Sequence, residues 1–231
     1  MRLLLIPILL TSSILSDTYI KNSVISNSII GDNFSSIDRS SSTFGSKHIR
    51  PRAKFSGIEI KFPAKLTVVK SSTPNIKLKM DKKFIDNILF KVYNDTLHIY
   101  TDSSINTNLK TEIIVQTESL NMLKVGGTTA VDIKGFTLQN FKLFVSGTAK
   151  VTFLSGSINH LFLQSEGTSR ISLEKIYVKR ARVVSKGTSK ITINVNETLN
   201  VNLSGISKVK YFGNPTIQKR IKGLGKLIKM N

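Results

Sequence analysis

The segment LFVSGTAKVTF at residues 143–153 recurs as LQSEGTSRISL at 163–173 and as VVSKGTSKITI at 183–193. Its glycine returns every twenty residues and then every eighteen, at Gly127, Gly147, Gly167, Gly187, Gly205 and Gly223. Thr follows each of the first four glycines. A fixed period of this length indicates a chain built from stacked copies of one short unit. Six such units account for roughly 110 of the 231 residues.

Apolar residues stand at three fixed distances from these glycines. Four residues after each glycine come Val131, Val151, Ile171, Ile191, Val209 and Leu227. Six residues after come Ile133, Phe153, Leu173, Ile193 and Tyr211, and four residues before come Leu123, Leu143, Leu163, Val183 and Val201. Residues at the odd distances are mostly polar or basic, so each unit is predicted to be two short strands with alternate side chains inward, bent at the glycine. Lys219 and Lys229 break the apolar series in the last unit, which predicts a polar cap.

Two architectures satisfy this pattern, a coil of parallel rungs or a meander of hairpins that turn at the Gly-Thr pairs. A meander of this many strands would have to close into a barrel or leave long edges, so the spacing favours the coil. Residues 51–119 alternate between apolar and polar as strands do, and Asn94-Asp95 is predicted to form a turn between two of them. No helix is predicted, and the fold class is all-β.

Several motifs resemble the bacterial head GIN domain family, which is named for the heads of auto-transporter adhesins. They are the Gly-Thr-x-x-Val/Ile turns, Phe55-x-x-Ile58, Leu97-x-Ile99, and the segments VKYFGNP at 209–215 and KGLGKL at 222–227. The resemblance covers roughly residues 54–230. It implies an exported, right-handed parallel β-helix-like solenoid of about six rungs, preceded by further strands. The family's turns usually read Gly-Ser-Gly or similar and often contain Asp, whereas here Gly-Thr-Ser or Gly-Thr-Ala is followed by a base.

The N-terminal residues predict export. Arg2, an apolar core at Leu3–Leu10 and a small polar stretch have the order of a secretory signal peptide, assigned to residues 1–16, although cleavage after Ser13 also fits. The core is too short to span a bilayer, so no transmembrane segment is expected after cleavage. Residues 17–50 are rich in Ser and Asn and are predicted to be a tether or loose cap; in the alternative, Val24, Ile25, Ile29 and Ile30 belong to an edge strand. Residues 51–231 are predicted to form one domain, and the protein is expected in the periplasm or at the cell surface.

Charge is the second distinctive feature. The chain has 34 Lys and Arg against 14 Asp and Glu, a net charge of +20, and it contains no Cys, which excludes disulfides, zinc–cysteine sites, iron–sulfur clusters and thiol catalysis. Three residues after the glycines stand the candidate anion-binding residues Lys150, Arg170, Lys190, Lys208 and Lys226, with Ala130 first in the series. Alternation points them outward, so stacking would align them about 4.8 Å apart.

This basic column has two interpretations. It is either a solvated face that keeps the wall soluble, or a surface for acidic glycans, lipopolysaccharide or other anionic polymers, with contact to a membrane surface or to proteins as further alternatives. A dedicated nucleic-acid site is not expected, because the aromatic residues are few and scattered. The glycines are expected to adopt positive φ, and Thr128, Thr148, Thr168 and Thr188 to form a structural hydroxyl ladder.

Catalysis finds little support in the sequence. The acids of the repeats, Asp132, Glu166, Glu174 and Glu197, stand at different offsets, so no two of them stack into a catalytic pair. The three histidines are expected to be surface residues without a metal: His48 in a linker, His98 on an outward strand position and His160 in a turn. No cofactor is expected. The sequence therefore predicts an exported, non-catalytic, adhesin-like binding module. A purely structural scaffold of the cell envelope and a polysaccharide lyase-like enzyme are the alternatives.

Overall fold

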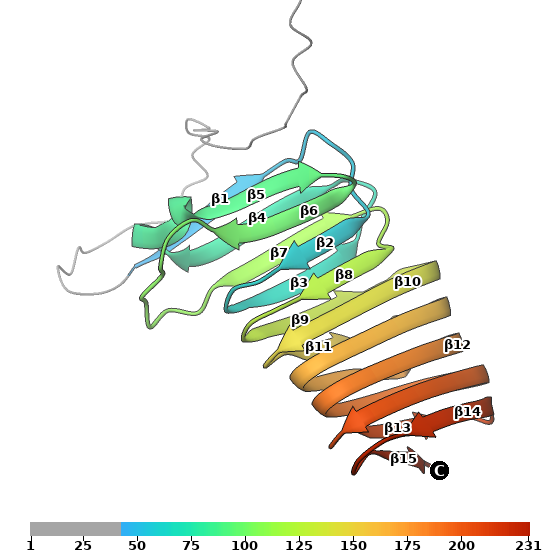
Figure 1. Ribbon diagram of the computed structural model, residues 1–231. Helices are drawn as coiled ribbons and strands as arrows, with labels where there is room; N and C mark the ends of the chain where they lie inside the picture. The colour runs from blue at the N-terminus through green and yellow to red at the C-terminus, as the bar shows by residue number, and fades with distance from the viewer. Residues whose placement is uncertain (1–42) are drawn as a thin grey trace, which may run out of the picture.

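The computed structural model describes residues 43–231 and consists mainly of strands (Figure 1). The predicted signal peptide 1–16, the possible strand around Val24 to Ile30 and most of the polar segment 17–50 lie outside the described residues. The strands are β1 (Phe44–Ile49), β2 (Gly57–Ile60), β3 (Ala64–Lys70), β4 (Asn75–Asp81), β5 (Ile88–Tyr93), β6 (Thr96–Thr101), β7 (Glu112–Thr117), β8 (Met122–Val125), β9 (Thr129–Lys134), β10 (Phe136–Gly147), β11 (Lys150–Phe153), β12 (Gly156–Gly205), β13 (Lys208–Phe212), β14 (Thr216–Ile221) and β15 (Lys226–Lys229).

The repeat region consists of parallel strands stacked in sequence order. β8, β10 and β12 pair in parallel so that Leu143 lies between Leu123 and Leu163, an offset of twenty residues. The offset becomes eighteen where β13 pairs with β12 and β15. Parallel pairing at the repeat period shows that the hairpin meander is wrong for this region. Figure 1 shows these strands as successive layers toward the C-terminus.

The N-terminal strands extend this stack and add antiparallel pairs to it. β2 and β3 continue it, because they pair in parallel with β8 and β9. Beyond them β1, β4 and β7 are antiparallel neighbours, and β5 forms an antiparallel hairpin with β6. The predicted Asn94-Asp95 turn is confirmed, with φ of 46° and 58° at its two residues, the left-handed pair that matches the twist of a tight hairpin. The all-β prediction is confirmed, and the sheet is mixed.

Two elements were not evident from the sequence. β1 lies inside the segment predicted as polar tether, and it pairs residue by residue with β4. A short 3₁₀ helix, η1 (Lys82–Asn87), follows β4. The Asp81 carboxylate begins this helix by accepting a hydrogen bond from the Lys83 amide at 3.1 Å, and it also accepts one from the Thr107 hydroxyl at 2.8 Å. Capping of this kind satisfies an otherwise unpaired backbone donor.

The interior consists of the predicted apolar columns. All residues of the three columns from the first five repeats are buried, and Tyr211, the most exposed of them, is 8% exposed. The columns end as predicted, since Leu227 is only partly buried whereas Lys219 and Lys229 are exposed. Lys at the end of a stack discourages a further strand from pairing there.

The repeated glycines form the tightest contact between layers. Gly147, Gly167 and Gly187 have φ of 77°, 95° and 108°, the region that disfavours any residue with a Cβ. A Cβ on Gly167 would lie 2.9 Å from the Gly147 carbonyl oxygen and 3.0 Å from its amide nitrogen. The backbones of successive layers therefore approach so closely at this corner that only glycine fits.

Two alanine substitutions separate the cost of positive φ from the cost of the close contact between layers. Gly167→Ala combines an unfavourable φ with the clash against Gly147, and we expect it to lower the free energy of unfolding by about 3 kcal/mol or more. Gly135→Ala is the control, because Gly135 has φ 82° but its Cβ would meet only Lys70 Cβ at 3.6 Å. We expect a loss of about 1–2 kcal/mol there. Urea denaturation measures both, and equal losses would show that the layers do not meet closely at the glycine corner.

Candidate functional site

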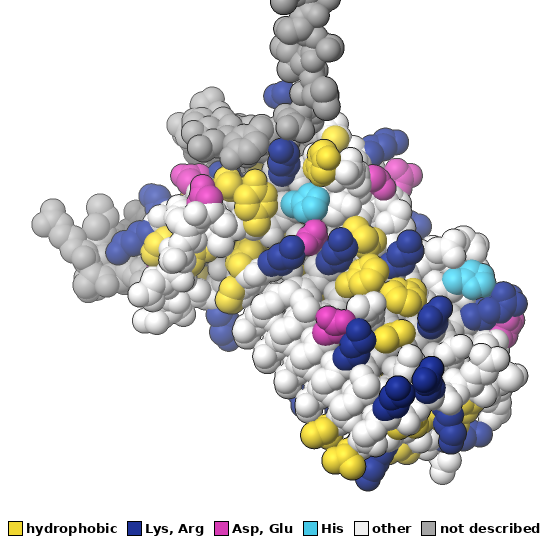
Figure 2. All heavy atoms as spheres, in the orientation of Figure 1, with side chains coloured by type: hydrophobic (Ala, Val, Ile, Leu, Met, Phe, Trp, Pro, Cys, Tyr) yellow, Lys and Arg dark blue, Asp and Glu magenta, His cyan; other side chains and the backbone are white. Residues whose placement is uncertain are grey.

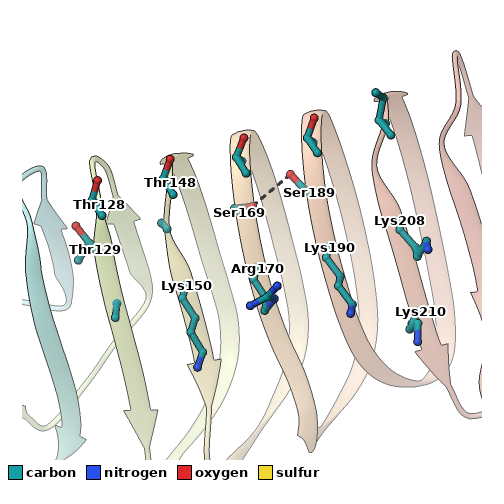
Figure 3. A pocket seen from close by; sticks show the side chains of 15 residues that line it. Thr128, Thr129, Thr148, Lys150, Ser169, Arg170, Ser189, Lys190, Lys208 and Lys210 are labelled. Atoms are coloured by element: carbon teal, nitrogen blue, oxygen red, sulfur yellow. Dashed lines mark hydrogen bonds between the residues drawn. The ribbon is translucent and has the colours of Figure 1, made fainter.

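The five candidate bases lie in one column on the outside of the stack. Lys150 pairs with Arg170, and Lys190 pairs with Lys208, which pairs in turn with Lys226. All five side chains are exposed. Figure 3 shows Lys150, Arg170, Lys190 and Lys208 on consecutive layers of the stack. The structure therefore brings the five bases together in register.

A groove of about 690 Å³ runs along this column. Four of the five bases line it, as does Lys210, whereas Lys226 does not. The groove contains the exposed residues that follow each glycine on one side and the bases on the other; the former are Thr128, Thr148, Thr168, Thr188 and Ile206. Each layer of the groove thus presents a threonine hydroxyl on one side and a base on the other, and this arrangement recurs from layer to layer. At the C-terminal end Ile206 takes the place of the threonine.

The threonines do not form the predicted ladder. None of these four hydroxyls makes a hydrogen bond to another described residue, so the prediction of a structural hydroxyl ladder is wrong. The residues that follow the threonines turn inward instead. Ser165, Ser169 and Ser189 are buried and hydrogen-bonded to one another at 2.6–3.2 Å, and Ser185 bonds to Ser207 at 2.8 Å. Figure 3 shows the bond between Ser169 and Ser189. Inward serines satisfy one another, which leaves the threonine hydroxyls facing solvent.

The five bases of the column also lack carboxylate partners. None of them forms an ion pair with a carboxylate among residues 43–231. Some bases elsewhere are paired with acids: Glu166 contacts Lys186 at 3.6 Å, and Glu197 contacts Arg180 at 2.9 Å. Figure 2 shows the face over β6, β2, β8 and β10, where acidic side chains lie beside Lys and Arg. Exposed bases outside the groove, such as Lys142, Lys175 and Arg182, also lack a carboxylate partner among residues 43–231, so what distinguishes the column is its alignment in register.

A cluster of paired charges lies on β2, β6 and β8. The Glu59 carboxylate contacts Lys61 Nζ at 2.6 Å and His98 Nδ1 at 3.2 Å, next to Lys124 on the neighbouring strand. Partial burial raises the pKa of Glu59, but the hydrogen bond from Lys61 and the charges of Lys61, Lys124 and His98 outweigh it, so the pKa lies below the usual glutamate value. The His98–Glu59 contact joins β6 to β2, and Lys124 lies opposite Glu59 on β8.

The remaining candidate catalytic groups do not converge. Asp132 lies between Thr67 and Thr152 in the sheet, and Glu166 and Glu197 belong to the separate ion pairs described above. His48 and His160 are exposed strand residues, although a linker and a turn were predicted. Within the described part of the chain, no three His, Asp or Glu side chains are grouped so that they could hold a metal ion.

Lys65 is a site residue that the sequence did not reveal. It pairs with Ala130, so it continues the basic column beyond its first repeat, and it lines a second groove of about 1070 Å³. Thr128 and Ala130 line both grooves, which makes them neighbours along one surface. Because Lys65 precedes the first Gly-Thr repeat, no sequence period places it in the column.

In-register repeats around an apolar interior, with a basic groove on the outside, define a repeat-containing all-β domain. The family model described as "Putative auto-transporter adhesin, head GIN domain" matches residues 54–215. The chain belongs to this head GIN domain family, which confirms the resemblance seen in its motifs. Across residues 43–231, we find no helix of the length and hydrophobicity needed to cross a bilayer.

Solved structures show the same fold at low sequence identity. A "putative adhesin" from Bacteroides fragilis is 20% identical, with a TM-score of 0.65 over 82% of this chain and 98% of the other. A "putative lipid binding protein" from Parabacteroides distasonis is 16% identical, with a TM-score of 0.54 over 81% and 97%. A "putative adhesin" from Parabacteroides merdae is 15% identical, with a TM-score of 0.53 over 81% and 96%. A search of curated proteins found no match.

The Glu59 cluster predicts a pH-dependent contribution to stability. Because the folded-state pKa is lowered, the contribution is fully present above the ordinary glutamate pKa and is lost as the pH falls through the folded-state value. We expect Glu59→Gln to lower the free energy of unfolding by about 1 kcal/mol at pH 6, with the difference from wild type shrinking below pH 4. The control is Glu118→Gln, which removes an exposed carboxylate that forms no ion pair. Denaturation between pH 3 and pH 6 measures both, and a difference that stays constant over this range would contradict the assignment.

Proposed function

We propose that this protein is an exported, non-catalytic binding module that holds anionic polymers of the cell envelope or its surroundings in the basic groove. The supporting observation is the in-register column of five exposed bases without carboxylate partners among residues 43–231, four of which line a concave surface. A concave surface of one charge sign concentrates counter-ions of the opposite sign. Acidic glycans and lipopolysaccharide are the candidate ligands. The family's adhesin name is consistent with export and with a binding role.

The proposal includes the architecture that presents this groove. We infer that the layers from β8 to β15 are successive turns of a right-handed parallel β-helix-like solenoid, to which β2 and β3 add a further turn. The constant offsets of twenty and eighteen residues support it, as does β12, a single strand of 50 residues that spans more than two repeats. A solenoid gives each turn the same outward residues, so that a surface site is repeated along its axis.

A threefold substitution tests the binding function. Lys150→Gln, Arg170→Gln and Lys190→Gln together remove three neighbouring charges from the groove. Heparin is the probe, and its affinity is measured by titration calorimetry at several salt concentrations. We expect wild-type affinity to fall steeply with salt and the variant to bind more weakly, with the slope of log affinity against log salt reduced by about three.

The matched control neutralises three exposed bases outside the groove, as Lys142→Gln, Lys175→Gln and Arg182→Gln. It removes the same two Lys and one Arg, so a general charge effect would weaken both variants equally and would contradict a groove site. Absence of heparin binding at low salt would favour a purely structural scaffold. Release of unsaturated sugars from an acidic polysaccharide, lost in the groove variant alone, would show a lyase instead.

A further inference from the structure

The geometry points to a linear acidic polysaccharide as the ligand, lying along the stack and across the strands, with one subsite per layer. This inference rests on the proposed binding function and adds the class of polymer, its direction and its length. It follows from the register of the groove residues, from the chemistry of the two sides of the groove, and from an interruption in the basic column.

Register places the five bases at equivalent positions on successive layers. Lys150 and Arg170 occupy equivalent positions on adjacent strands, as do Lys190, Lys208 and Lys226. Adjacent strands lie about 4.8 Å apart, so the five bases span about 19 Å in a straight line. A ligand that satisfies all five must be extended and must carry charge at regular intervals along its axis. Extended chains of pyranose rings meet this condition, because each ring advances the chain by nearly one strand spacing.

The chemistry of the groove selects among linear polyanions. The solvent-facing hydroxyls of Thr148, Thr168 and Thr188 are available as hydrogen-bond donors and acceptors opposite the bases, which suits a ligand with hydroxyls of its own. No aromatic side chain occurs among the described residues that line this groove. Single-stranded nucleic acid is bound through base stacking on such side chains, so the groove lacks what that ligand needs. A bilayer presents a flat surface, which a concave groove does not match.

Ala130 interrupts the column and therefore limits the length of the ligand. It lies in register between Lys65 and Lys150, so the five consecutive bases end at Lys150, and the next base is two layers away. Ala130→Lys would join Lys65 to the other bases and lengthen the column from five positions to seven. The residue is half-buried at the outer surface and Lys occupies the equivalent position on β11, so the strand accepts this side chain.

The experiment measures the affinity of the full chain for heparin-derived oligosaccharides of two to twelve sugars. We expect wild-type affinity to rise with length and to level off at about five to six sugars, the length of five layers at one ring per layer. Ala130→Lys should move this plateau to about eight sugars and raise the affinity of the longest oligosaccharides about fivefold. Thr137→Lys is the matched control, because it adds the same charge at an exposed position outside the groove; it should leave the plateau length unchanged.

The outcomes separate this inference from the function on which it rests. Absence of binding by any length, including intact heparin, would overturn both. Salt-dependent binding whose affinity rises with length without a plateau, or an equal effect of Ala130→Lys and Thr137→Lys, would overturn the linear-subsite inference and leave the binding function standing. Tighter binding of duplex DNA of equal length, or of vesicles with anionic lipid, than of heparin would overturn the choice of polysaccharide.

Discussion

The close approach of backbones at the glycine corner is the constraint on which the rest of the structure depends. Positive φ and the short distance between Gly147 and Gly167 admit no side chain, so each layer meets the next at one fixed place. A slip of one residue would turn every inward side chain outward. The corner therefore fixes the register of the layers. This register places the apolar columns inside and the basic column outside.

The alignment of bases has an energetic consequence. Like charges at the spacing of adjacent strands repel, by about 1 kcal/mol per pair in water before screening by salt. The buried columns, which run without a gap from Leu123 to Val201 on one wall and from Val131 to Tyr211 on the other, hold the layers together against this repulsion. In the proposed function, a bound polyanion would relieve this repulsion. In the Glu59 cluster, by contrast, a carboxylate of the protein itself contacts the neighbouring bases, Lys61 and His98.

The fixed repeat along the stack explains which features could be predicted from the sequence. Val151, Ile171 and Lys190 could be placed because each repeats its neighbour at a fixed offset, and pairing preserves that offset. Lys65 and β1 lie outside the repeats, and their positions depend on pairings between segments with no shared pattern. Alternation also separates the adjacent hydroxyls at the corner, because Ser169 stands at an even distance from Gly167 and points inward, whereas Thr168 stands at an odd distance and points outward.

The central claim is that equivalent residues of successive repeats form one straight outer column. Because the chain contains no Cys, nitroxide labels can be attached only where cysteine is introduced, at Ala130 with Lys190, Lys208 or Lys226. Pulsed electron spin resonance then measures the distance between the two labels. In-register stacking predicts backbone separations of about 14, 19 and 24 Å, in equal steps of one strand spacing. Distances that do not increase in equal steps would show that the bases are dispersed around the molecule, and would contradict the column and the groove built on it.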